Sequence, residues 1–94
     1  MIDDSLEGLK VSYESIPVSE KVLLLLHSLC AVKPEIAKTG EELSRYVQVA
    51  VDTIGRMLDK HEEEGYVNSY VDHYGAKKYY LTGRGIIKVC SSFT

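Results

Sequence analysis

The feature that most constrains the fold of this chain is a change in its apolar periodicity at Gly65. Before Gly65, apolar residues recur at helical spacing from Val51 to about Glu64. After it, residues 66–72 alternate and are rich in aromatic and β-branched types, a pattern typical of a strand. A glycine-centred turn over residues 73–76 leads into a second strand-like run at 77–81. The sequence therefore predicts a helix that ends at a C′ glycine and is followed at once by a β-hairpin.

The stretch from Val18 to about Val32 has the strongest helical pattern ahead of this unit. Its apolar residues recur at i, i+3, i+4 and i+7. Ser19 is the expected N-cap, and Pro34 is expected to end the helix. Leu23 and Leu24 add apolar surface beyond the main stripe, so this helix must be covered on more than one side. The cover is the N-terminal segment, the C-terminal helix or a second subunit.

Two shorter helices complete the pattern. Thr39 and Glu42 have the spacing of a capping box, which predicts a helix over residues 41–47. Thr82 is placed to cap a last helix at the C-terminal end of the chain. In the helix at 51–64, the residues expected to face inward are Val51, Ile54, Leu58 and His61, with Met57 at the flank.

The order of elements is helix, short helix, helix, two-stranded hairpin, helix. This order predicts an α+β, mostly helical fold of the winged helix-turn-helix type. Ninety-four residues are a usual length for one domain. We therefore expect a single winged-helix domain over residues 1–94, with 1–17 as an N-terminal extension and 18–92 as the core.

The net charge of −3 argues against an indiscriminate nucleic-acid binder, but the charge is unevenly distributed. Residues 1–20 hold five acids and one base, whereas residues 65–94 hold four bases and one acid. The longest apolar run, Val22–Leu26, is far short of a membrane span. The acidic start Met1-Ile2-Asp3-Asp4 is unlike a secretory signal. We expect a cytoplasmic protein with no membrane partner.

No pattern in the chain is typical of an enzyme or of a cofactor site. A nucleophile elbow, a phosphate loop and a metal-hydrolase signature are all missing, and the acids at 41–42 and 62–64 are helix neighbours that mostly face solvent. His61 is either a satisfied, half-buried histidine near a helix C-terminus or a metal ligand together with His27, Cys30, His73 or Cys90. The first interpretation is preferred, and we predict no enzyme, no cofactor and no metal.

The two cysteines, Cys30 and Cys90, lie far apart and outside any CxxC motif. We expect two buried, reduced thiols. The alternative is a disulfide, either within the chain or between two chains. The scarcity of Asn and Gln, limited to Asn68 and Gln48, is a faint sign of a thermophilic source, where intracellular disulfides do occur.

The segment from Gly40 to Gly85 resembles the winged-helix regulators of the MarR and related archaeal and bacterial groups. The resemblance is carried by Glu42-Leu43-Ser44, by TIGRMLDKHEEEGYV at Thr53–Val67 and by GAKKYYLTGRG at Gly75–Gly85. It implies a transcription regulator that binds double-stranded DNA in a sequence-specific manner. The helix at 51–64 would enter the major groove as the recognition helix, and the hairpin would lie on the backbone as the wing.

The expected DNA contacts are outward residues of the recognition helix and residues of the wing. Arg56 can pair with a guanine or a phosphate, and the alternative is a solvated charge paired within the helix. Strand alternation directs Lys77 and Lys78 to opposite faces, so that one contacts phosphate and the other is partly structural, or both guard the strand edge. The predicted DNA-binding residues are Arg45, Gln48, Val49, Asp52, Thr53, Arg56, Lys60, His73, Tyr74, Lys77 and Lys78.

A homodimer is expected because a palindromic operator requires two recognition helices and one domain presents only one. The surplus leucines of the helix at 18–32 and the apolar C-terminal helix are candidate dimer surfaces. The alternative function is a winged-helix module for protein contacts in a transcription or chromatin complex, favoured by the acidic balance and the surface tyrosines. Tyr70 and Tyr80 are expected to face each other across the hairpin.

Overall fold

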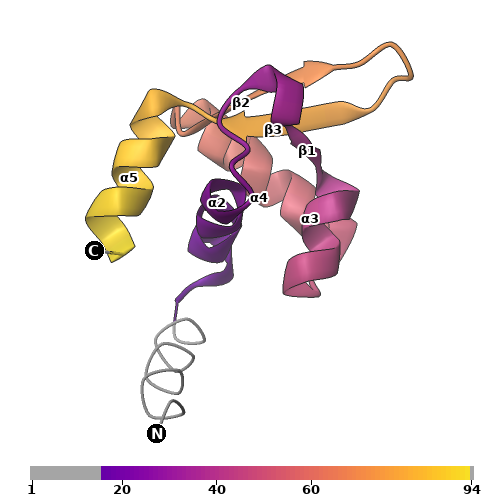
Figure 1. Ribbon diagram of the computed structural model, residues 1–94. Coiled ribbons are helices and arrows are strands. Elements are labelled where there is room, and N and C mark those ends of the chain that lie inside the picture. Colours follow the sequence, from indigo (N-terminus) through magenta and orange to yellow (C-terminus); the bar gives the residue numbers. More distant parts are fainter. Residues whose placement is uncertain (1–15, 94) are drawn as a thin grey trace, which may run out of the picture.

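The structure is a computed structural model that describes residues 16–93 of the chain, so most of the expected N-terminal extension lies outside the described residues. Helices and strands follow in the predicted order, with two additional short elements, η1 and β1 (Figure 1). The α+β, mostly helical fold class is thus confirmed. The elements are α2 (Val18–Ser28), η1 (Pro34–Ile36), β1 (Lys38–Thr39), α3 (Gly40–Val47), α4 (Val51–Glu63), β2 (Val67–Val71), β3 (Lys77–Leu81) and α5 (Gly83–Phe93).

The predicted hairpin is present, and a third strand is added to it. β2 and β3 pair antiparallel from Val67 opposite Leu81 to Val71 opposite Lys77. β1 pairs antiparallel with the other edge of β3, so the sheet order is β1-β3-β2. β1 is only two residues long, too short to display the alternation that reveals a strand in a sequence. It attaches the segment ahead of α3 to the sheet.

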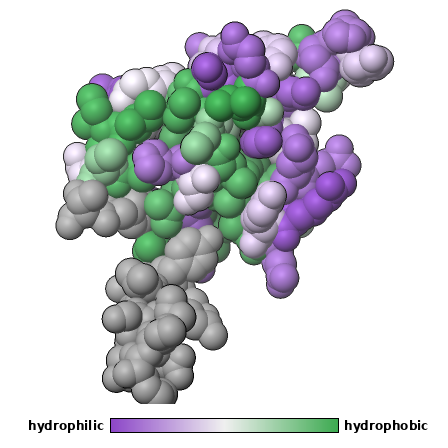
Figure 2. All heavy atoms as spheres, viewed as in Figure 1, coloured by the Kyte–Doolittle hydropathy of each residue, from purple (hydrophilic) through white to green (hydrophobic). Residues whose placement is uncertain are grey.

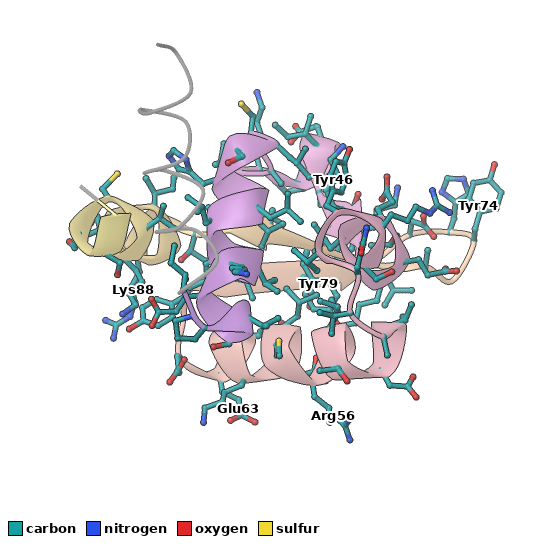
Figure 3. All side chains as sticks on the ribbon, turned by 90° about the horizontal axis from the view of Figure 1, so that it is seen from below. Tyr46, Arg56, Glu63, Tyr74, Tyr79 and Lys88 are labelled. Carbon is teal, nitrogen blue, oxygen red and sulfur yellow. The ribbon has the colours of Figure 1, made fainter. Side chains whose placement is uncertain are left out.

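α2 lies at the centre of the molecule, with α5, α3 and α4 around it (Figure 3). Its Val22, Leu23 and Leu26 are fully buried, and each such aliphatic side chain contributes about 1.5–3 kcal/mol through burial. The expectation that this helix is covered on more than one side is therefore confirmed, and helices of the same chain supply cover. The rest of the core comprises Ala31, Leu43, Ile54, Leu58, Val67, Tyr79, Leu81 and Val89.

The start of α2 differs from the prediction. The helix begins at Val18, directly after Pro17, and no side chain caps it, so the expectation that Ser19 is the N-cap is wrong. Ser19 lies inside the first turn, and its carbonyl accepts a hydrogen bond from His61 Nε2 at 2.8 Å. Ser19, which the sequence pattern predicts as a helix cap, thus takes part in a contact with α4 instead.

The end of α2 also comes earlier than expected, at Ser28 instead of about Val32. Cys30 adopts a left-handed conformation with φ of 59°, and its N–H and that of Ala31 donate back to carbonyls of the last turn. The Ala31 carbonyl then accepts a hydrogen bond from Leu81 N–H at 2.7 Å. The chain leaves the helix early because this segment joins α2 to β3.

No disulfide joins Cys30 and Cys90, and both residues are exposed. The expectation that both thiols are buried is therefore wrong. Cys30 lies in the turn that follows α2, and Cys90 lies on α5.

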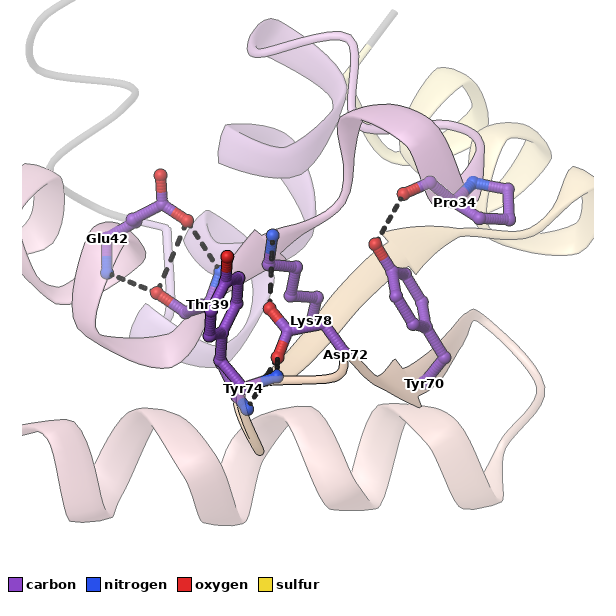
Figure 4. Close-up of polar contacts among 8 residues, drawn as sticks. Pro34, Thr39, Glu42, Tyr70, Asp72, Tyr74 and Lys78 are labelled. Atoms are coloured by element: carbon purple, nitrogen blue, oxygen red, sulfur yellow. Dashed lines mark hydrogen bonds and ion pairs between the residues drawn. The ribbon is translucent and has the colours of Figure 1, made fainter.

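The capping box at the start of α3 is confirmed (Figure 4). Glu42 N–H donates to Thr39 Oγ1 at 3.1 Å, and Thr39 N–H donates to Glu42 Oε1 at 2.9 Å. The hydrogen bond from the Thr39 backbone lowers the pKa of Glu42. The carboxylate therefore stays ionised at the helix N-terminus, where negative charge is favourable.

Gly65 marks the end of α4, as predicted. Its φ is 84°, a conformation that glycine adopts without the steric cost that a Cβ brings. The N–H groups of Gly65 and Tyr66 donate to the carbonyls of Glu62 and His61 at 3.0 and 2.9 Å, which closes the helix. The chain therefore turns directly from α4 into the hairpin.

Thr82 joins the hairpin to the last helix. Its Oγ1 accepts from Gly85 N–H at 3.0 Å, so the predicted cap is confirmed. The same hydroxyl donates to the Gly65 carbonyl at 2.6 Å, and Thr82 N–H donates to the Tyr66 carbonyl at 3.0 Å. Gly85 lies against the Tyr66 carbonyl so closely that no side chain fits there.

We expect Gly85→Ala to destabilise the fold by about 3 kcal/mol, the scale of overpacking that cannot relax. A Cβ at residue 85 would overlap the Tyr66 carbonyl oxygen and lie 2.9 Å from Leu81 Cδ2. Urea denaturation followed by circular dichroism measures the free energy of unfolding. The control is Gly83→Ala in the same helix, where a Cβ meets nothing within 4 Å. Equal losses in the two variants would contradict this description of the junction.

Candidate nucleic-acid interface

α3 and α4 are joined by a tight turn over residues 48–50. Gln48 is left-handed, with φ of 55°, and its N–H donates to the Ser44 carbonyl at 2.8 Å. A non-glycine residue in this conformation costs roughly 1 kcal/mol. The packing of the two helices, which bury Leu43 and Ile54, offsets this cost. Gln48 and the neighbouring Arg45 are both exposed, as DNA contacts would have to be.

The polar side of α4 faces solvent. Arg56 and Glu63 point away from the body of the molecule in Figure 3. Asp52 and Lys60 are exposed as well. Two further residues predicted to contact DNA are half-buried, Val49 in the turn ahead of α4 and Thr53 in its first turn.

One residue expected in the core lies outside it. Ile54, Leu58 and His61 are buried as predicted, but Val51 is 44% exposed. Val51 is the first residue of α4 and its side chain lines a cleft that opens toward the hairpin. Helical periodicity alone does not distinguish a residue that faces the core from one that faces such a cleft.

The turn of the hairpin is organised by Asp72 (Figure 4). Its Oδ1 accepts from Tyr74 N–H and from Ala76 N–H, each at 2.9 Å, and its Oδ2 lies 3.5 Å from Lys78 Nζ. The hydrogen bond from Ala76 N–H is the main cause of the lowered pKa of Asp72, and Tyr74 N–H and Lys78 act in the same direction. Gly75, with φ of 87°, completes the turn.

The tip of the hairpin presents two neighbouring aromatic side chains. The ring centres of His73 and Tyr74 lie 4.3 Å apart with the rings tilted by 40°, and Tyr74 is 85% exposed. Figure 3 shows Tyr74 at the far end of the hairpin, away from the helices. Both residues, predicted as DNA contacts, are therefore accessible.

Lys77 is held against α4. Its Nζ lies 3.4 Å from Asp59 Oδ1 and 3.7 Å from Glu62 Oε1, and 5.3 Å from the ring centre of Tyr79. Partial desolvation lowers the pKa of Lys77, but the charges of Tyr79 and Asp59 act against it, and on balance the pKa is raised. Asp59 and Glu62 were not expected as partners of the hairpin. Their three-residue spacing places both acids on one side of the helix, and this was the only feature of the sequence that could have indicated a shared partner.

Lys78 lies on the opposite face of the hairpin, as strand alternation predicts. Tyr70 is directly across from Lys78, and its hydroxyl donates to the Pro34 carbonyl at 3.0 Å. The expectation that Tyr70 faces Tyr80 is wrong, because Tyr80 lies opposite Asn68. The turn at Asp72 sets this register.

A cleft of about 310 Å³ separates the hairpin from the N-terminal half of α4. Gly55 on the helix and Gly75 and Ala76 on the hairpin form part of its walls, and a Cβ at Gly55 would meet nothing within 4 Å. Lys77 also lines the cleft. A chain with larger residues at these positions would have a narrower opening between the two elements.

His61 is buried near the C-terminal end of α4, more deeply than the half-buried position expected. Its Nε2 is hydrogen-bonded, but none of the described residues hydrogen-bonds to its Nδ1, so the preferred interpretation of a satisfied histidine is confirmed for one ring nitrogen only. Within residues 16–93, no group of three or more His, Cys, Asp or Glu side chains is arranged to hold a metal ion. In the same range, no helix combines the length and apolar character needed to cross a membrane.

Comparison with known proteins places the fold. No family model matches the sequence, and no match is found among the curated proteins. Solved structures match it well, however. The chain aligns with MepR from Staphylococcus aureus in its DNA complex, with a TM-score of 0.68 and 17% identity, over 97% of this chain and 72% of that one. The chain has the winged-helix fold.

Two further structures agree with this assignment. A putative DNA-binding protein from Ralstonia eutropha aligns with a TM-score of 0.71 and 18% identity, over 85% of this chain and 100% of that one. Wild-type apo MarR from E. coli aligns with a TM-score of 0.66 and 24% identity, over 79% of this chain and 52% of that one. The winged-helix chain thus spans about half the length of MarR. The expected resemblance to MarR-type winged-helix regulators is confirmed.

The lowered pKa of Asp72 predicts how the wing turn responds to acid. The ionised carboxylate stabilises the turn fully above pH 3.8, the ordinary pKa of this group, and the stabilisation is lost as pH falls through the lower folded-state pKa. In an NMR titration, the amide resonances of Tyr74 and Ala76 should shift with a midpoint below 3.8. Asp72→Asn should remove that transition. A midpoint at or above 3.8 in the native protein would contradict the hydrogen-bonded turn.

Proposed function

We propose that this protein is a transcription regulator that binds double-stranded DNA in a sequence-specific manner, with α4 in the major groove and the wing on the backbone. The observation that carries the proposal is the exposed polar side of α4, with Arg56 pointing outward, beside the wing. A major groove about 12 Å wide admits an α-helix. The fold shared with MepR, which was solved in a complex with DNA, supports DNA as the partner.

The cleft between α4 and the wing has a role in this proposal. When a helix occupies the major groove and a wing approaches the adjacent minor groove, the phosphodiester strand between the grooves passes between them. Gly55, Gly75 and Ala76 leave room for that strand, and Lys77 lies beside it. Arg56 would contact a base or a phosphate from the groove side.

The charge balance predicts an interaction of modest electrostatic strength. Residues 16–93 hold ten acidic and ten basic side chains, so the net charge of −3 resides in residues 1–15. On α4 itself, Asp52 and Glu63 are exposed on the outer side with Arg56 and Lys60. Binding would therefore depend on a few local contacts, which favours specific over indiscriminate binding.

We expect Arg56→Ala to weaken binding to a specific DNA fragment by about 1–3 kcal/mol, as loss of a base contact does. Fluorescence anisotropy with genomic fragments across a salt series measures the affinity, which should fall as salt rises. The control is Lys33→Ala, which removes the same charge at an exposed site ahead of η1. The proposal fails if no binding occurs at low salt, or if both variants weaken it equally.

Asp59→Asn should strengthen DNA binding by about two- to fivefold, the scale of an exposed ion pair. The change removes a negative charge from the proposed interface and leaves Lys77 with only one of its two carboxylate partners within residues 16–93, Glu62. Glu35→Gln is the control, because it removes a negative charge from the exposed η1. Unchanged or weaker binding in Asp59→Asn would place Lys77 outside the DNA contact.

We also propose that the protein acts as a homodimer. A palindromic site needs two recognition helices, and one chain carries only one. Ile87 on α5 is 67% exposed, Cys90 is exposed one turn further on, and Figure 2 shows hydrophobic residues gathered on the side that carries α5. An apolar surface of this kind is typical of a subunit contact.

Ile87→Glu should convert the dimer to a monomer, because it introduces a charge into the proposed apolar contact. Sedimentation equilibrium reports the oligomeric state. Val71→Glu is the matched control, since Val71 is 62% exposed but lies on the wing. A native protein that is already monomeric, or an Ile87→Glu variant that stays dimeric, would exclude α5 as the dimer surface.

Exposed aromatic residues favour a second candidate function, a winged-helix module for protein contacts. Tyr46 is 61% and Tyr74 is 85% exposed, and large aromatic side chains are enriched in protein interfaces. Absence of DNA binding at low salt would make this the better-supported function.

A further inference from the structure

His61 has a buried ring nitrogen that no hydrogen bond satisfies. Its Nε2 lies 2.8 Å from the Ser19 carbonyl oxygen, and because a carbonyl only accepts, Nε2 carries a proton. In the neutral ring with this tautomer Nδ1 is an acceptor, and none of the described residues donates to it. His61 is only 7% exposed, and a buried acceptor without a donor is unfavourable. A hydrogen-bond donor to Nδ1 is therefore expected from outside residues 16–93.

His61 lines a cavity of about 450 Å³. The cavity is bounded by the first turn of α2, the last turn of α4, the segment that enters β2, and α5. Glu64, which also lines it, has Oε1 3.7 Å from His61 Nδ1, too far for a hydrogen bond. A water molecule occupies about 30 Å³ in the liquid, so the space accommodates a small organic molecule.

The charges around the cavity restrict what can bind there. Two carboxylates, Glu20 and Glu64, and two ammonium groups, Lys60 and Lys88, line it. A ligand with only a positive charge would be repelled by the two lysines. A ligand with only a negative charge would be repelled by the two glutamates. A molecule with both charges can pair with both sets, and its ammonium group can also donate to His61 Nδ1.

The remaining wall is apolar. Met57 and Tyr66 line the cavity, and Arg84 Cζ and Lys88 Nζ lie over the Tyr66 ring, 5.3 and 5.9 Å from its centre. Because two cations already lie near this ring, we expect a ligand to make an apolar contact with Tyr66. A further cation is not expected there. A ligand with an aliphatic or aromatic side chain suits this wall.

We propose that this cavity binds a small zwitterion of the α-amino acid class. The ammonium group donates to His61 Nδ1 and pairs with Glu64, and the carboxylate faces Lys60 and Lys88. The apolar side chain lies against Met57 and Tyr66. This site is separate from the proposed DNA contacts, except that Lys60 belongs to both sets.

The test is a ¹⁵N NMR titration of the histidine rings of the full chain with L-leucine and with L-phenylalanine. A saturable shift of His61 Nδ1 is expected with at least one of them. The N-acetyl derivative, which lacks the ammonium group, and the amide derivative, which lacks the carboxylate, should each bind about tenfold more weakly or worse. The rings of the exposed His27 and His73 should not respond.

Two variants test the assigned contacts. Glu64→Gln should weaken binding about tenfold, whereas Glu63→Gln, the neighbouring exposed acid outside the cavity, should leave it unchanged. Circular dichroism melting checks that both variants fold. The proposal is overturned if His61 Nδ1 responds to neither amino acid, which would indicate a water molecule as the donor, or if the derivatives bind as well as the parent compounds. Because the assay contains no DNA, its failure is distinguishable from failure of the proposed function.

Discussion

The relative placement of α4, the wing and α5 depends on the contacts made with the backbone carbonyl of Tyr66. This carbonyl directly follows the left-handed turn at Gly65 and accepts the N–H of Thr82. Gly85 packs against it with no space for a side chain. The wing therefore leaves α4 in a defined direction, which brings Lys77 within ion-pair distance of acids on the helix. The proposed DNA surface consists of α4 and the wing, and this junction holds the two side by side.

α4 serves two sets of contacts at its two ends. Its N-terminal half, with Arg56 outward and Gly55 toward the wing, belongs to the proposed DNA surface. His61 in its last turn and Glu64 directly after it line the cavity next to α2. The ion pairs of Lys77 with Asp59 and Glu62 lie between them. In the proposed DNA complex, a helix whose charges are balanced in this way would attract phosphate less strongly. Discrimination between DNA sequences would then depend more on individual contacts.

Several features could be predicted because they depend on residues close together in the sequence. The end of α4 at Gly65, the capping box of Thr39 and Glu42, and the cap at Thr82 each involve partners within five positions. Other expectations failed where distant contacts intervene. The pairing of Tyr70 with Lys78 follows from the turn at Asp72, which a pattern of strand residues does not specify. Val51 fits the apolar stripe of α4 yet borders a cleft beside the hairpin, which helical periodicity does not reveal.

Backbone chemistry that is local in the chain was enough to establish the order of elements, the helix–hairpin boundary and the polar side of α4. Glycine conformation, capping side chains and apolar period act over a few residues, so they can be read without coordinates. The partners of Lys77 and the unsatisfied nitrogen of His61 emerged only from the folded chain. Asp59 is 18 positions from Lys77, and Ser19 is 42 positions from His61. Contacts over such separations depend on how whole helices pack, which no local pattern encodes.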